Sequence, residues 1–181
     1  MTSPALSRAA CPGCGIELEE VSGPTHDYIG ASPACWALYT ELLARDYGEY
    51  GMPEEHKFVV DAYAVQHPGE NEPRARQSVG IHLIRLCLML ERGAPQRYAT
   101  GLMSRATYGG LHIPWFDPVT PLGTMTVADV LAAPDRGAHV AASRAWAEDL
   151  WAAWSAQQPT IRRWCDALQA QLPEDQSLNN V

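Results

Sequence analysis

The sequence lacks several features that define common classes of protein. No run of apolar residues approaches the roughly 18 that a membrane-spanning helix requires, and the first ten residues contain no apolar core of a signal peptide. Positive charge is scarce, with 13 Lys and Arg against 21 Asp and Glu and a formal net charge of −8. A general affinity for nucleic acids or anionic membranes needs a basic face. We therefore expect a cytoplasmic protein that binds neither.

Familiar catalytic motifs are missing as well. The sequence contains no Gly-x-Ser-x-Gly, no phosphate-binding glycine loop, no dinucleotide-binding fingerprint and no His-Glu-x-x-His. It has five cysteines, an odd number, which in a cytosolic chain favours metal binding or burial over disulfides. The sequence thus identifies no reaction, and its chemistry has to be sought in the cysteines and histidines.

The composition and the apolar periodicity predict a single all-α domain, a helical bundle. A chain of 181 residues with 46% hydrophobic residues is long and apolar enough for one core. Residues 1–10 are expected to be a flexible arm, residues 11–172 the domain and residues 173–181 a frayed tail. No alternating pattern predicts a sheet. The expected helices cover residues 33–47, 53–66, 74–92, 95–105, 126–133, 138–157 and 161–172, and a long loop rich in Pro, Gly and aromatic residues covers 106–125.

Three sequence signals mark helix ends within this pattern. Ser32 followed by Pro33 predicts a helix start, with Ser as the N-cap and Pro at the first helical position. Gly93 is expected to close the third helix as a C-cap glycine. Thr126 with Asp129 resembles a capping box.

The segment Cys11-Pro12-Gly13-Cys14-Gly15 predicts a metal site, most simply for zinc. A Cys-x-x-Cys pair lets two thiolates reach one ion across a tight turn, and zinc prefers tetrahedral sulfur and nitrogen ligands. Cys35 is the expected third ligand, because the first turn of the Ser32 helix favours a thiolate. His26 is the nearest imidazole and is taken as the fourth ligand, with His67 or a more distant group as its competitor. Cys87 and Cys165 fall on apolar helical faces and are expected in the core.

A second candidate site involves histidines of the second and third predicted helices. If the second helix reaches His67, then His56, Tyr63 and His67 point in similar directions at about 100° per residue, and His82 lies on the core-facing side of the next helix. Three imidazoles with an open position would form a catalytic metal site, with Tyr63 or Asp61 assisting. Histidines hydrogen-bonded for structural reasons, or a metal-free acid/base pair, explain the same residues.

Several blocks of sequence resemble a known family. The segments CPGCG, HDYIGASPACWALYTELLARDYG, HKFVVDAYAVQHPGE and QSVGIHLIRLCLMLERG, with TVADVLAA and RAWAEDLWAAW, resemble an uncharacterised bacterial family, the domain-of-unknown-function family number 5946. The resemblance covers about residues 11–170 and implies a single domain. It implies no activity, so the metal assignments rest on residue chemistry alone.

Three functions remain open from the sequence. In the first, zinc joins the N-terminal segment to a helical bundle and does no chemistry. In the second, a metal-dependent enzyme acts on a small molecule through His56, His67 and His82. In the third, a regulator senses metal or oxidant through its thiolates. The physiological partner is unknown, and a tryptophan-rich surface on residues 146–164 could support a homodimer.

Overall fold

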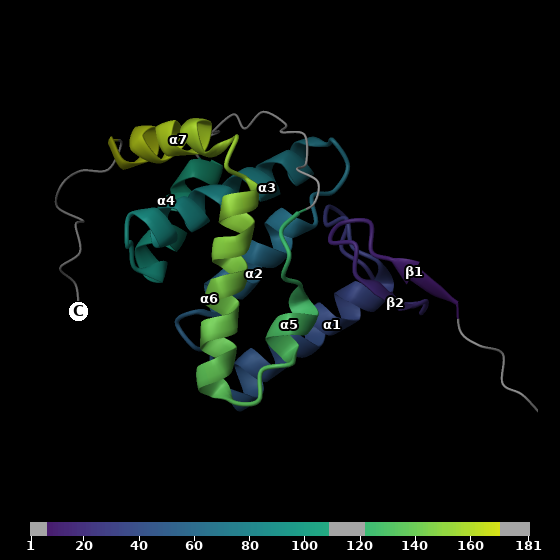
Figure 1. Cartoon of the computed structure of the whole chain (residues 1–181). Helices are drawn as coiled ribbons and strands as arrows, with labels where there is room; N and C mark the ends of the chain where they lie inside the picture. The colour runs from purple at the N-terminus through teal and green to yellow at the C-terminus, as the bar shows by residue number, and fades with distance from the viewer. Residues whose placement is uncertain (1–6, 109–121, 171–181) are drawn as a thin grey trace, which may run out of the picture.

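The computed structural model describes residues 7–108 and 122–170. Residues 109–121 of the expected long loop, the first six residues of the expected arm and the expected tail lie outside this description. The predicted helical fold is confirmed. The helices are α1 (Pro33–Ala44), α2 (His56–Gln66), α3 (Pro73–Leu86), α4 (Gln96–Tyr108), α5 (Val127–Leu131), α6 (Arg136–Ala153) and α7 (Gln158–Ala170) (Figure 1). Among the described residues, no helix has the length and apolarity that crossing a membrane would take.

The structure confirms the predicted helix ends. The Ser32 side chain accepts a hydrogen bond from the Cys35 backbone N–H at 3.2 Å and so caps α1. Thr126 and Asp129 form the capping box of α5. Gly93 has a φ of +61°, the left-handed conformation in which a C-cap glycine commonly ends a helix.

Two helices that the sequence predicts as continuous, residues 33–47 and 74–92, each end in a π-helical turn. Turn η1 (Arg45–Glu49) continues α1, and turn η2 (Cys87–Glu91) continues α3. Such turns are frequent at functional sites. In η1 the wider turn includes Asp46, whose side chain is completely buried.

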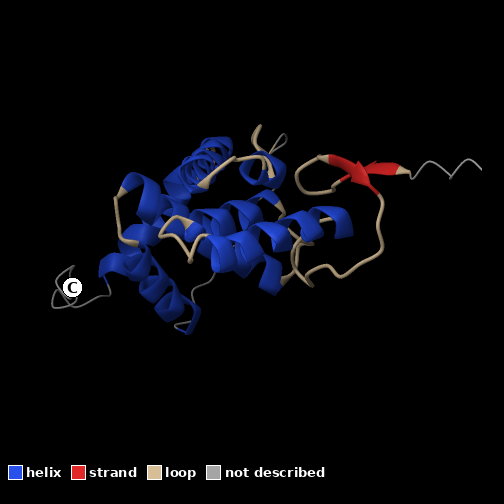
Figure 2. Cartoon of the chain, turned by 90° about the horizontal axis from the view of Figure 1, so that it is seen from below, coloured by secondary structure: helices blue, strands red, loops and turns tan. Residues whose placement is uncertain are grey.

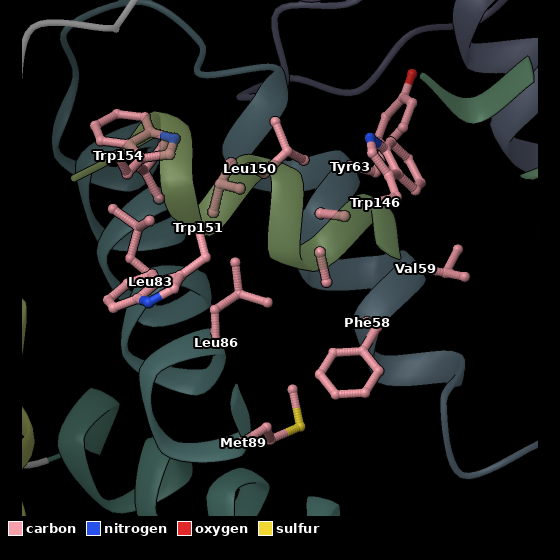
Figure 3. Packing of buried hydrophobic residues seen from close by; sticks show 14 of the residues in the cluster. Phe58, Val59, Tyr63, Leu83, Leu86, Met89, Trp146, Leu150, Trp151 and Trp154 are labelled. Atoms are coloured by element: carbon pink, nitrogen blue, oxygen red, sulfur yellow. The ribbon is translucent and has the colours of Figure 1, made fainter. Parts of the chain in front are cut away.

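The core forms around α2, which packs against both α3 and α6 (Figure 3). Trp146 and Trp154 are fully buried and Trp151 is 8% exposed, so these three side chains form core and not a surface for association. A homodimer stays a prediction. Gln66 at the end of α2 is also buried, and its side-chain oxygen accepts a hydrogen bond from the Trp146 indole N–H at 3.2 Å. This polar contact fixes the register between α2 and α6.

A short antiparallel hairpin precedes the helices, which the sequence did not predict. Its strands are β1 (Arg8–Ala10) and β2 (Glu17–Glu19), with Ala9 opposite Leu18. The hairpin extends from one end of the bundle, next to α1 (Figures 1 and 2). Its strands are three residues each and largely exposed, so they carry no alternating apolar pattern that would have predicted them. The turn between them contains the cysteine pair.

Candidate metal centre

The turn of the hairpin presents two thiols on the same side. The Gly15 N–H donates to the Cys11 carbonyl at 2.9 Å, and the Cys11 N–H donates to the Ile16 carbonyl at 2.9 Å. Gly15 adopts a φ of +74°, a conformation that L side chains rarely take. The chain therefore reverses within five residues, and Cys11 and Cys14 face one point.

Cys35 supplies a third thiol from the first turn of α1. Its side chain is completely buried, and its Sγ lies 3.8 Å from the Cys14 Sγ. Because Ser32 caps the helix, Cys35 sits in the first turn, where the positive end of the helix dipole stabilises a thiolate. The cap signal in the sequence thus has a direct consequence for the site.

His67 supplies an imidazole from the end of α2. Its Nδ1 lies 2.8 Å from the Tyr63 carbonyl, so Nδ1 carries the proton and donates it there. This hydrogen bond leaves Nε2 as the nitrogen that faces the thiols, and Nε2 lies 3.3 Å from the Cys35 Sγ. A metal-binding histidine is oriented in the same way, with its second nitrogen held by a carbonyl or carboxylate.

The four side chains match the ligand set of a closed zinc site. One ligand atom from each of Cys11, Cys14, Cys35 and His67 lies within 4.8 Å of all the others. Zinc–sulfur bonds of about 2.3 Å in a tetrahedron separate two sulfurs by about 3.8 Å, which equals the 3.8 Å between Cys14 and Cys35. All five cysteines are free thiols, so no disulfide competes for these sulfurs. The group could therefore hold a metal ion.

Hydrogen bonds around the thiols suit them to carry negative charge. The Ser32 backbone N–H donates to the Cys11 Sγ at 3.4 Å, and the Tyr63 hydroxyl donates to the Cys35 Sγ at 3.7 Å. Three thiolates around a divalent cation leave one net negative charge, which donors of this kind stabilise. The Tyr63 ring also stacks on the His67 ring at a centroid distance of 4.0 Å, which holds the imidazole in place.

The thiols shift each other's pKa because they share one small space. Hydrogen bonds from Cys14 and Cys35 lower the pKa of Cys11, whereas the hydrogen bond with Cys11 raises the pKa of Cys35. Burial is the largest effect on His67 and lowers its pKa, but hydrogen bonds with Cys11 and Cys14 outweigh it and raise the pKa to about 9. The lowered pKa of Cys11 favours its thiolate, which is the form of cysteine that binds a metal ion.

Gly13 shows how tightly the turn packs on the imidazole. A Cβ added at Gly13 would lie 2.4 Å from the Cδ2 of His67 and 2.7 Å from the Gly30 carbonyl oxygen. Gly30 is in turn so close to the Pro68 carbonyl that its own Cβ would lie 2.6 Å from that oxygen. The turn at residues 11–15 (the knuckle), the loop before α1 and the end of α2 therefore meet without space for a Cβ at Gly13 or Gly30.

The structure places His67, and not His26, beside the three thiols. The His26 ring packs edge-on against Tyr28 at 4.3 Å and is tilted against Trp36 at 5.4 Å. Sequence distance favoured His26, but the loop from 22 to 31 carries it to another face of α1. His67 was the alternative to His26 as the fourth ligand. Its close approach to Gly13 is visible only in the folded chain.

The candidate catalytic histidines do not come together, because each has a different partner. The Nδ1 of His56 donates to the Asp46 Oδ2 at 2.8 Å, and the Nε2 of His139 donates to the Asp46 Oδ1 at 2.6 Å. All three side chains are buried to 1% exposure or less. One carboxylate thus joins η1 to α2 and to α6. His56 therefore has the structural, hydrogen-bonded role that was one of the explanations open from the sequence.

His82 has its own carboxylate. Its Nδ1 lies 2.6 Å from the Oδ1 of Asp61, a fully buried side chain on α2, and the Arg85 guanidinium lies 3.3 Å from the other Asp61 oxygen. The residues expected at a catalytic site thus serve different groups. Asp61 is hydrogen-bonded to His82, the Tyr63 hydroxyl donates to the Cys35 thiol, and His67 lies in the thiol group itself. Cys87 and Cys165 are both completely buried in the core, as the sequence predicts.

The fold and the site together define a mostly helical protein with a Cys3His group that could hold a metal ion. The chain belongs to the family of unknown function DUF5946, whose model matches residues 9–155. This match includes all four side chains of the group and confirms the resemblance seen in the sequence. Comparisons with curated proteins and with solved structures gave no significant match.

Proposed function

We propose that the protein binds one zinc ion through Cys11, Cys14, Cys35 and His67, and that the ion joins the N-terminal hairpin to the helical bundle. The observation that carries this proposal is the convergence of four ligand atoms from three separate segments within 4.8 Å. The ion would tie the hairpin, which extends from one end of the bundle, to the start of α1 and the end of α2 (Figure 1).

The arrangement favours a structural ion over a catalytic one. All four tetrahedral positions would be filled by protein atoms, whereas catalytic zinc keeps one position for water or substrate. Cys11 is 3% exposed, and Cys35 and His67 are fully buried, which limits access to the ion. An enzyme built on His56, His67 and His82 lacks comparable support, because those rings have three different partners.

The experiment is metal analysis of purified variants with a matched pair of histidine changes. We expect about one zinc per chain in the parent protein and in His26→Gln, and loss of zinc or much weaker binding in His67→Gln. The double change Cys11→Ser, Cys14→Ser should abolish binding. Cobalt substitution should give the absorption of a tetrahedral site with three sulfur ligands.

Two results would contradict the proposal. One is a parent protein that binds no zinc in reducing buffer. The other is zinc that survives His67→Gln and is lost in His26→Gln, which would assign the fourth ligand to His26.

A further inference from the structure

Beside the metal centre, the structure contains a cavity of about 430 Å³ between α1, α2, α3 and the loop before α1. This volume lies within the range of about 300–1,000 Å³ that is usual for small-molecule sites. Zinc binding at the thiol group does not use it. The cavity therefore offers a binding site beyond the proposed function.

One wall of the cavity is aromatic. His26, Tyr28, Trp36, Tyr39 and Tyr63 all line it. The rings of Tyr39 and Tyr63 stack at a centroid distance of 3.8 Å, and the Trp36 ring lies 5.3 Å from Tyr39 and 5.8 Å from Tyr63. Burial raises the pKa of both tyrosines, so their hydroxyls stay neutral. The wall therefore offers uncharged ring faces and edges that favour a planar ligand.

A second part of the lining is polar and comes from one face of α3. Arg74, Gln77, Ser78 and His82 line it, with Arg74, Ser78 and His82 at successive i, i+4 positions. Arg74 is exposed, and within residues 7–108 and 122–170 no carboxylate lies at ion-pair distance from it. In a chain with a net charge of −8, an arginine at a cavity without an acidic partner is available for an anionic ligand.

His82 is oriented as a ligand-binding residue. Its Nδ1 is taken by the buried Asp61, which in turn contacts Arg85. The ring lines the cavity, so Nε2 is the nitrogen available to a ligand, and it accepts a hydrogen bond when Nδ1 carries the proton. Arg74 and His82 lie eight residues apart, about 12 Å along the helix axis. A ligand that reaches both is longer than a single aromatic ring.

We propose that this cavity binds a planar two-ring aromatic molecule with a carboxylate at one end and a hydroxyl at the other. The rings lie against Trp36, Tyr39 and Tyr63. The carboxylate binds the Arg74 guanidinium, and the hydroxyl donates to the Nε2 of His82. Arg74 carries the charge recognition, and the aromatic wall covers the rings of the ligand.

The probe for this proposal is 6-hydroxy-2-naphthoate, titrated into nitrogen-15-labelled protein and followed by two-dimensional NMR. We expect saturable shifts at the Trp36 indole N–H and at α3, with a dissociation constant of about 1 mM or below, the strength usual for a fragment of this size. Neutral 2-naphthol tests the charge, and 2-naphthoate, which lacks the hydroxyl, tests His82. The hydroxyl should strengthen binding about threefold to tenfold, as one hydrogen bond does.

A matched pair of arginine changes on α3 tests the charge recognition. Arg74→Gln should weaken binding of 6-hydroxy-2-naphthoate about tenfold and leave 2-naphthol unaffected. Arg76→Gln removes the same charge two residues away, outside the cavity lining, and should change neither affinity. Arg74 is exposed, so its replacement should not disturb folding.

Three results would overturn the proposal. The first is the absence of saturable shifts at the cavity with about 10 mM probe. The second is an equal loss of affinity in Arg74→Gln and Arg76→Gln, which would indicate nonspecific attraction. The third is equal binding of the two naphthoates, which would remove His82 from the site. Zinc content measured on the same samples keeps the two proposals separate. A parent protein that binds the probe but no zinc would contradict only the zinc proposal, and one that binds zinc but not the probe would contradict only the cavity proposal.

Discussion

Replacing Gly13 by Ala should damage the metal centre although Gly13 contributes no ligand. The new Cβ would lie 2.4 Å from the His67 Cδ2 and 2.7 Å from the Gly30 oxygen, against about 3.4 Å or more for ordinary contacts of this kind. Relief therefore moves the turn and the imidazole apart by about 1 Å. Metal–ligand distances tolerate only about 0.2 Å. We expect the change to break the bond between zinc and His67.

The size of the effect follows from the binding energy of structural zinc. Sites in zinc-finger peptides bind with about 10–16 kcal/mol at pH 7. If four ligands share this equally, one ligand accounts for about 3 kcal/mol, which corresponds to a loss of affinity of about 100-fold to 1,000-fold. Steric displacement of one ligand should therefore give a large and measurable loss without removing any thiol.

A competition titration against a chromophoric zinc chelator measures this affinity directly. Gly101→Ala is the control, because a Cβ at Gly101 in α4 would meet nothing within 4 Å. Gly15→Ala separates strain from steric clash, since Gly15 has a φ of +74° but open space around its Cα. If Gly13→Ala binds zinc within about threefold of the parent protein, the assignment of His67 as a ligand packed on the turn is refuted.

Three further changes test individual polar contacts. Asp46→Ala leaves two buried histidines without their carboxylate and should lower the free energy of unfolding by about 3–5 kcal/mol in urea titrations of the zinc-loaded protein; a loss below about 1 kcal/mol would contradict its role. The hydrogen bond from Arg162 lowers the pKa of Glu91, so its stabilisation is present above about pH 4.3 and is lost as the pH falls through the lowered value. Glu91→Gln should therefore lower Tm at pH 7, and the difference from the parent should shrink on acidification; a constant difference would argue against it. Tyr63→Phe removes the hydroxyl donor at 3.7 Å from the Cys35 Sγ and should weaken zinc binding by no more than about tenfold in the chelator assay, whereas complete loss of zinc would show that the hydroxyl does more than donate this bond.

Local signals predicted the parts of the fold that depend on neighbouring residues. Ser32 with Pro33 marks the start of α1 because capping needs only the first turn, and the cap also places Cys35. Cys11 and Cys14 reach one point because two residues separate them. The structure brings all three thiols together, as the spacing and the cap indicate.

Such local signals could not predict the contacts between segments that are distant in the sequence. His67 reaches the thiols because the end of α2 packs against the knuckle, 53 residues after Cys14 by their numbering. The contact of Asp46 with His139 joins residues 93 positions apart. Periodicity places Asp46 and His139 on helices and His67 directly after one, but it does not choose their partners. Sequence distance favoured His26 for the fourth ligand, and tertiary packing sends its ring to the aromatic wall instead.

The metal centre and the cavity share a wall, so the two proposals together predict coupling between zinc and the ligand. The Tyr63 hydroxyl contacts the Cys35 Sγ while its ring lines the cavity. Trp36 directly follows Cys35, and His26 and Tyr28 lie in the segment between Cys14 and Cys35. Tyr39 and Tyr63 are held by the core, so the part of the wall that depends on zinc is the loop that carries His26 and Tyr28.

Removing zinc with a chelator should therefore weaken binding of 6-hydroxy-2-naphthoate by at least about fivefold, the lower end of ordinary coupling between two sites. Circular dichroism on the same samples must show that the helices remain, so that unfolding is not measured instead. Because coupling of binding free energies is reciprocal, a saturating concentration of the naphthoate should raise the zinc affinity by the same factor. Equal naphthoate affinities with and without zinc, in protein that keeps its helices, would show that the aromatic wall does not depend on the ion.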